Sequence, residues 1–146
     1  MGALATIDHL RYPPEYLRGI LDRTRTIAVV GASPEPWRAS HGVSAYLKRA
    51  GYRIIPVIPT AVGERVHGEA VIAALADIRE PIDLVNVFRR PQFLPGVVEE
   101  AITAGAPAVW MQLGIRHEGA KDRAEAAGVA VVMDRCISVE HRRLFG

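Results

Sequence analysis

The chain has 146 residues, which suits one domain, and 49% of them are hydrophobic, as in an ordinary globular protein. A formal net charge of +2 without any Lys/Arg run argues against a nucleic-acid partner, and the single cysteine excludes an internal disulfide. No apolar stretch has the length of a membrane span, and the first residues lack the layout of a secretory signal. We therefore expect a cytoplasmic protein with no membrane partner.

The first third of the chain predicts a helix followed by a strand–turn–helix unit. A helical pattern over residues 6–23, interrupted by two prolines, predicts a helix packed on the edge of a sheet. Residues 26–30 are apolar and mostly β-branched, as in a strand covered on both faces. Gly31 ends this strand, and the next helix is expected to begin between residues 35 and 41 and to end near Ala50.

The same alternation continues to the end of the chain. Further strands are predicted at residues 52–59, 82–88, 108–112 and 129–133. Further helices are predicted at residues 69–76, 91–105 and 118–127 and late in the tail 134–146. Alternating strands and helices indicate βαβ units, so the predicted fold is α/β, with a five-stranded parallel sheet and helices on both faces.

In such sheets ligands bind outside the carboxyl ends of the strands, which directs attention first to the segment from Gly31 to Arg38. A glycine turn before a helix exposes N–H groups that bind phosphate well. The match to the dinucleotide pattern G-x-G-x-x-G is partial, because Ser33 stands where the second glycine would be. A plain strand-to-helix connection without a ligand is the alternative.

The loop after the second strand, residues 56–59, has no carboxylate at the position where NAD-binding domains place one for the ribose. This disfavours NAD, and the lack of an arginine there gives no support to NADP. The apolar, proline-rich loop offers a wall for an adenine ring or a thin acyl-like arm, or else it simply ends the strand.

The next two loops carry polar groups. Arg89 and Arg90 follow the third strand and present charge and fork-shaped donors to phosphate, unless they lie in a solvated loop paired with Glu99 or Glu100. The fourth strand leads to Gln112 and Gly114, an amide side chain and a position that allows close backbone approach, although turn formation alone would also explain the glycine.

Five motifs in order at five strand ends resemble the small, stand-alone CoA-binding proteins. The motifs are Gly31-Ala32-Ser33, Pro56-Val57-Ile58-Pro59, Val87-Phe88-Arg89-Arg90-Pro91, Trp110-Met111-Gln112-Leu113-Gly114 and Asp134-Arg135-Cys136. The fold of that family is similar to the N-terminal CoA-binding domain of the succinyl-CoA synthetase α subunit, and the resemblance covers about residues 20–140. It implies a Rossmann-like fold, with one CoA-binding domain over residues 1–146 and CoA or an acyl-CoA lying across the strand ends.

The resemblance also implies roles for individual residues. Gly31, Ala32 and Ser33 would meet a CoA phosphate. The nucleotide would be flanked by Val57, Ile58 and Pro59. The pantetheine arm would pass Phe88, Arg89, Gln112 and Gly114. Ile58 stands where the family usually has asparagine, so no side-chain hydrogen bond is expected from it.

The roles of three further residues stay open between a ligand contact and a structural position, and a fourth residue is expected in the core. Arg38 pairs with a CoA phosphate or is an ordinary exposed arginine, and His41 touches phosphate or lies on the surface. Cys136 forms a mixed disulfide with CoA through a thiolate stabilised by Arg135, or it is a small buried apolar residue. Trp110, within a strand, is expected in the core.

No nucleophile elbow, Ser/His/Asp arrangement or carboxylate pair can be placed in the sequence. We therefore expect binding of CoA or an acyl-CoA without catalysis by this chain alone, together with a protein partner or a homo-oligomer. The alternatives are an NAD(P)-binding oxidoreductase-type domain and an interacting protein whose pocket is vestigial.

Overall fold

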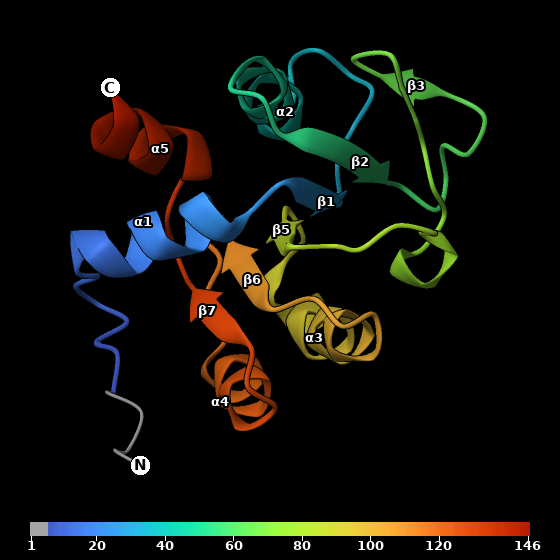
Figure 1. Ribbon diagram of the computed structural model, residues 1–146. Helices are drawn as coiled ribbons and strands as arrows, with labels where there is room; N and C mark the ends of the chain where they lie inside the picture. The colour runs from blue at the N-terminus through green and yellow to red at the C-terminus, as the bar shows by residue number, and fades with distance from the viewer. Residues whose placement is uncertain (1–5) are drawn as a thin grey trace.

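The structure is a computed structural model that describes residues 6–146, so the first five positions of the predicted domain lie outside the described part (Figure 1). The helices are α1 Pro14–Arg23, α2 Ala39–Arg49, α3 Leu94–Thr103, α4 Glu118–Ala126 and α5 Ile137–Phe145, with 3-10 turns η1 Leu75–Asp77 and η2 Pro91–Phe93. The strands are β1 Thr26–Val30, β2 Arg53–Val57, β3 Arg65–Val66, β4 Glu69–Ala70, β5 Leu84–Val87, β6 Ala108–Met111 and β7 Ala130–Val132. No helix within residues 6–146 combines the length and apolar character needed to cross a membrane.

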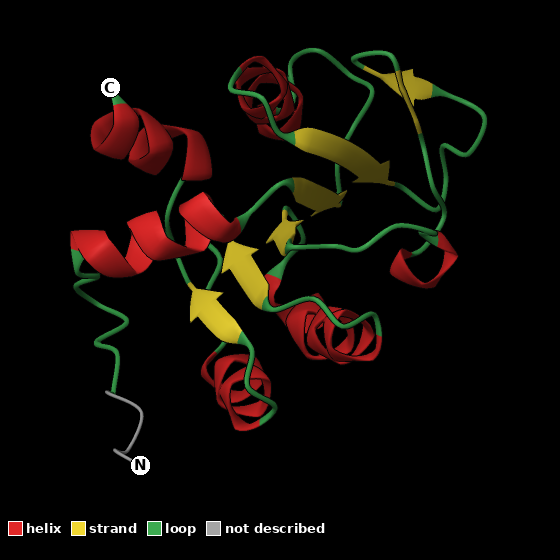
Figure 2. Ribbon diagram, in the orientation of Figure 1, coloured by secondary structure: helices red, strands yellow, loops and turns green. Residues whose placement is uncertain are grey.

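Five strands form one parallel sheet in the order β2-β1-β5-β6-β7, which confirms the predicted Rossmann-like α/β fold (Figure 2). The register places Val30 of β1 beside Val57 of β2 and Val87 of β5. These three strands therefore end at the same level. β2 lies at one edge of the sheet, which is where a strand containing Pro56 is tolerated.

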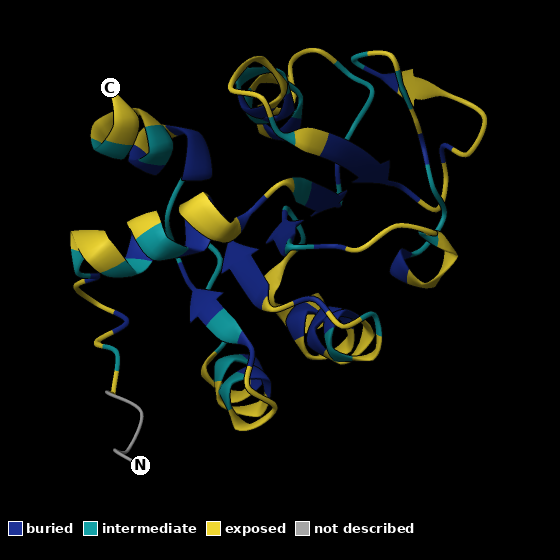
Figure 3. Ribbon diagram, in the orientation of Figure 1, coloured by how far each residue is buried: buried dark blue, intermediate teal, exposed yellow. Residues whose placement is uncertain are grey.

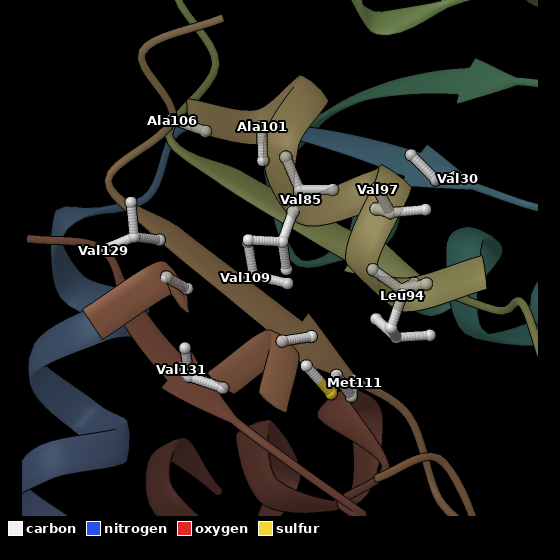
Figure 4. Packing of buried hydrophobic residues seen from close by; sticks show 14 of the residues in the cluster. Val30, Val85, Leu94, Val97, Ala101, Ala106, Val109, Met111, Val129 and Val131 are labelled. Atoms are coloured by element: carbon white, nitrogen blue, oxygen red, sulfur yellow. The ribbon is translucent and has the colours of Figure 1, made fainter. Parts of the chain in front are cut away.

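Helices cover both faces of the sheet. α3 and α4 pack on one face, where Val85, Val109 and Met111 meet α3 residues such as Leu94 and Val97 (Figure 4). On the other face α1, α2 and α5 surround a second cluster that contains the fully buried Trp110 (Figure 1). The sheet strands are accordingly buried along most of their length (Figure 3). Burial on both faces explains why the strands read as continuous apolar runs in the sequence.

The predicted helix over residues 6–23 was wrong in its first half, since α1 begins only at Pro14. A residue that precedes proline is disfavoured in helical geometry, and Pro13 is accordingly extended, with ψ of 138°. α1 does reach the sheet edge, as predicted. The Tyr16 hydroxyl donates to Val131 O at 2.8 Å and accepts from Val131 N at 3.1 Å, which satisfies backbone groups on the free edge of β7.

The predicted helix over residues 69–76 was wrong. The segment forms β4, which pairs with β3 in a short antiparallel hairpin, and then runs as a single extended crossing to η1. Ile72 N donates to Pro56 O and Ile72 O accepts from Ile58 N, both at 2.9 Å, so the segment continues the edge of the sheet beyond β2. Pairing with a distant strand therefore outweighs the helix-like spacing of the apolar residues.

Candidate functional site

The carboxyl ends of β1 and β5 mark the point where strand order reverses, because the chain runs outward from β1 to β2 and then returns to the other side of β1 as β5. Gly31 follows β1 and Phe88 follows β5. Phe88 N donates to Val30 O at 2.8 Å, and Gly31 N donates to Val57 O at 3.2 Å. These bonds hold three strand ends together, so the loops after them open on one side of the sheet.

The turn after β1 requires glycine. Gly31 has φ of 82°, in the region that side chains disfavour, and a Cβ atom there would lie 2.7 Å from Phe88 O and 2.8 Å from Arg89 Cγ. The loop after β5 thus packs directly against the turn after β1. The glycine lets two neighbouring strand ends approach each other at the point where order reverses.

A cavity of about 560 Å³ lies over these strand ends. Residues from the turn after β1, the start of α2 and the loops after β2 and β5 line it. Among the predicted site residues, those that line it are Gly31, Ala32, Ser33, Arg38, Ile58 and Phe88. Residues far apart in the sequence, predicted from separate motifs, thus border one space.

Hydrogen-bond donors suited to an anion border the cavity. α2 begins at Ala39, and Ala39 and Ser40 belong to the first turn, where backbone N–H groups have no intrahelical acceptor. Arg38 precedes the helix without capping it through its side chain. Ser33 Oγ accepts from Glu35 N at 3.1 Å, which fixes the approach to the helix. An anion lying against this turn would meet free N–H groups and the positive end of α2.

Two carboxylates border the same cavity. Glu35 lies 3.3 Å from the Arg38 Nε in an exposed ion pair. Glu64 also lines the cavity and forms no ion pair or side-chain hydrogen bond with any residue of the described chain. The loop at residues 56–59 indeed has no carboxylate, but Glu64 supplies one to the cavity from further along the chain. Sequence reasoning missed it because only the folding of the loop brings it back.

Arg89 and Arg90 lie at the carboxyl end of β5. The Arg89 guanidinium stacks over the Phe93 ring at 4.0 Å from its centroid, and that of Arg90 lies at 5.7 Å. Neither has a carboxylate partner within residues 6–146, because Glu99 is instead bound by Arg123 at 2.7 Å. The hydrogen bond from Arg123 holds the pKa of Glu99 below its usual range. The salt-bridge alternative for the arginine pair is therefore wrong, and Arg89 lies beside the Gly31 turn without lining the cavity.

The other predicted positions lie outside the cavity wall. Val57 is buried in the core, and Pro59 is exposed after the strand. Gln112 is also buried, where it donates to Asn86 Oδ1 and accepts from Ile137 N at 3.3 Å. Gly114 N donates to Asp134 Oδ1 at 2.6 Å in an open turn. The structure thus brings Gln112 and Gly114 to the strand ends on the β6 side, away from the residues that border the cavity.

His41 belongs to the first turn of α2 but does not line the cavity. Its ring lies 4.1 Å from that of His67 in the β3–β4 turn, and His67 Nε2 donates to His41 O at 2.7 Å. Desolvation and the neighbouring His67 lower the pKa of His41. The pair fastens the hairpin to α2. Within residues 6–146 no group of three or more His, Cys, Asp or Glu side chains is placed to hold a metal ion.

A parallel sheet with a glycine turn and a helix start at its switch point places this chain among the Rossmann-like α/β proteins. The family described as CoA binding domain matches residues 25–142. The chain belongs to that family.

Known relatives match most of this chain, and two solved structures share its fold. The uncharacterized protein YneT of Bacillus subtilis (strain 168) is 46% identical over 125 residues, which is 86% of this chain and 91% of the relative. A solved structure of the Thermus thermophilus protein ID.343 is 43% identical, with a TM-score of 0.87 over 91% of this chain and 99% of that one. A hypothetical protein of Pyrococcus horikoshii OT3 is 35% identical, with a TM-score of 0.89 over 99% of this chain and 100% of that one.

Proposed function

We propose that this protein binds CoA or an acyl-CoA in the cavity at the carboxyl ends of β1, β2 and β5, without catalysis by this chain alone. Family membership supports CoA as the ligand, and the cavity at the switch point supports the place. The observation that carries the proposal is the meeting of the Gly31 turn and the α2 start around one space, with Arg89 packed against the turn just outside the cavity wall.

The proposed pose follows from the charges. The diphosphate lies against the first turn of α2 on the side of Arg89, where free N–H groups and a guanidinium without a carboxylate partner in residues 6–146 favour negative charge. The adenosine extends toward Ile58 and the loop after β2. The pantetheine arm leaves past Phe88 toward the β6 side, where Gly114 allows close approach.

The hydroxyl groups at the cavity have no base that would activate them for nucleophilic catalysis. Ser33 Oγ accepts the Glu35 N–H, and neither Ser33 nor Ser40 hydrogen-bonds to a histidine or carboxylate base within residues 6–146. An unactivated hydroxyl is a weak nucleophile. The chain therefore acts as a carrier, a sensor or a subunit, with a protein partner or a second copy supplying any reaction.

Isothermal titration with CoA, NAD and NADP in parallel tests the proposal. We expect CoA to bind and the two dinucleotides to bind more weakly or not at all. In Ser33→Tyr the new side chain fills the turn, so CoA binding should be lost while the circular dichroism spectrum stays native. Thr103→Tyr, at the exposed carboxyl end of α3 and near the amino end of β6, is the matched control and should bind normally.

Three results would contradict the proposal. Binding of NAD or NADP without CoA would favour an oxidoreductase-type domain. Binding of none of the three would favour a vestigial pocket. CoA binding that survives Ser33→Tyr with a native spectrum would place the ligand elsewhere on the molecule.

A further inference from the structure

The wall of the cavity is not uniformly suited to phosphate. It contains one guanidinium, that of Arg38, and two carboxylates, those of Glu35 and Glu64. Arg38 and Glu35 neutralise each other in an ion pair at 3.3 Å. Glu64 has no such partner within residues 6–146, so it gives its side of the cavity a local negative charge.

The position of Glu64 is fixed by its backbone. Glu64 N donates to Ala61 O and Glu64 O accepts from Val71 N, both at 3.1 Å. Its neighbour Arg65 turns to Gly68 O, to which Nη1 donates at 2.8 Å. The adjacent cation is therefore engaged elsewhere and does not neutralise the Glu64 carboxylate.

The two sides of the cavity consequently favour different ligand groups. Beside the Gly31 turn lie the α2 start and Arg89, which favour a diphosphate. The loop after β2 places Glu64 on the other side. In sheets of this type the phosphates lie at the turn after the first strand, and the adenosine ribose reaches toward the end of the second strand. The ribose would thus face Glu64.

A carboxylate at that place acts on the ribose in two ways. It accepts hydrogen bonds from free ribose hydroxyl groups, and it repels a phosphate attached to the same ribose. CoA carries a phosphate on the 3′ oxygen of its ribose, and the 3′-dephospho form of CoA carries a hydroxyl group there. The charge of Glu64 therefore opposes the first ligand and suits the second.

We propose that Glu64 is a specificity-determining residue that makes this site prefer 3′-dephospho-CoA, or its acyl esters, to CoA. The inference rests on the proposed function, since it assumes that a CoA-type ligand occupies the cavity. It adds a ligand class to that function and assigns a role to a residue that no motif marked. Arg89 and the α2 start hold the diphosphate in both ligands, so they do not discriminate between them.

Titration calorimetry with CoA and with dephospho-CoA, at low and at physiological salt, tests the preference. We expect dephospho-CoA to bind about three- to tenfold more tightly than CoA, as one exposed carboxylate acting on a nearby phosphate would cause, and the ratio to fall as salt screens the charge. Glu64→Gln should bring the two constants together, mainly by tightening CoA. The control Glu100→Gln, an exposed position on α3, should keep the original ratio.

The outcomes separate this inference from the function on which it rests. Equal or tighter binding of CoA by the unmodified protein overturns the preference alone. A ratio that Glu64→Gln leaves unchanged overturns the role of Glu64 alone. If neither ligand binds to the unmodified protein, the proposed function fails and the inference fails with it.

Discussion

Replacing Gly31 by alanine tests whether the close approach of two strand ends organises this molecule. The new Cβ would lie 2.7 Å from Phe88 O and 2.8 Å from Arg89 Cγ, at a residue with φ of 82°. The backbone of Phe88 cannot yield easily, because its N–H donates to Val30 O at 2.8 Å in the ladder between β1 and β5. The substitution must therefore distort the turn or separate the strand ends.

The expected cost has two parts. Forcing a side chain into the left-handed region costs about 1–2 kcal/mol, and overpacking against a fixed backbone adds about 1–3 kcal/mol. Gly128→Ala is the matched control, because Gly128 has φ of 81° and open space around its missing side chain. Gly128→Ala should lose only the free energy that a side chain at positive φ costs. We therefore expect Gly31→Ala to lose about 1–3 kcal/mol more of the free energy of unfolding than Gly128→Ala.

Urea unfolding followed by circular dichroism measures both losses, with the free energy extrapolated linearly to water. The comparison holds if the dependence on urea is the same for the three proteins. Equal losses for Gly31→Ala and Gly128→Ala would refute the reasoning, since the contact with the β5 loop would then carry no weight. CoA binding should weaken in Gly31→Ala only, because Phe88 borders the cavity.

Four further substitutions give independent tests. Arg89→Ala should weaken CoA binding by about 1–3 kcal/mol in calorimetry by removing a charged hydrogen bond, and unchanged affinity would remove this arginine from the site. Tyr16→Phe should lower the free energy of unfolding by about 1–2 kcal/mol in urea, since two backbone groups of β7 lose their partner; a neutral result would deny that the hydroxyl protects the edge. A hydrogen bond from Lys48 lowers the pKa of Glu69 below 4.5, so the ionised Glu69 carboxylate stabilises the fold fully above pH 4.5 and loses this effect as pH falls through the lowered pKa. Glu69→Gln should therefore lower the free energy of unfolding at pH 7, and the difference from the unmodified protein should shrink as the pH of the unfolding experiment is lowered. Oxidised CoA should add one CoA to the intact mass through Cys136, whose thiolate displaces a CoA thiol, whereas Cys136→Ser should stay unmodified; no adduct on the native chain would end the disulfide hypothesis.

The strands were predictable because the cause of their pattern is local. A parallel strand buried on both faces needs apolar, β-branched residues throughout, and residues 26–30 and 108–112 satisfy this without reference to the rest of the chain. Helix starts after glycine turns are equally local, and α2 begins within the predicted interval. Parallel strands then require helical crossovers, so the fold class followed from the alternation.

The failures occurred where distant residues decide the structure. The segment before Pro14 is held by tertiary bonds, since His9 Nε2 lies 2.9 Å from Glu125 Oε2 and Tyr12 Oη accepts from Met133 N at 2.7 Å. Its helical periodicity reflects positions that face α4 and β7 rather than a helix. Local sequence rules do not separate such a segment from a true helix, because the spacing of apolar residues does not show which element they pack against.

The site was predictable in part for the same reason. A buried strand followed by glycine predicts the Gly31 turn from the sequence alone. Glu64 does not, because its place depends on the loop after β2 folding back over the turn. Arg89 lies between these cases: its position after β5 was evident, but the absence of a carboxylate partner depended on Arg123 binding Glu99. Strand ends can thus be located from sequence, whereas the charge balance around them requires the fold.

Gln112 shows how a strand-end residue can serve the site without touching a ligand. Its amide donates to Asn86 and accepts from Ile137 N, so both functional groups are engaged beneath the sheet surface. Breaking either bond would leave a buried polar group unpaired, at a cost of about 1–3 kcal/mol. We therefore expect this side chain to stay in place when a ligand binds. We expect Gln112 to fix the start of α5, and hence the position of Cys136, while the Gly114 backbone meets the ligand arm.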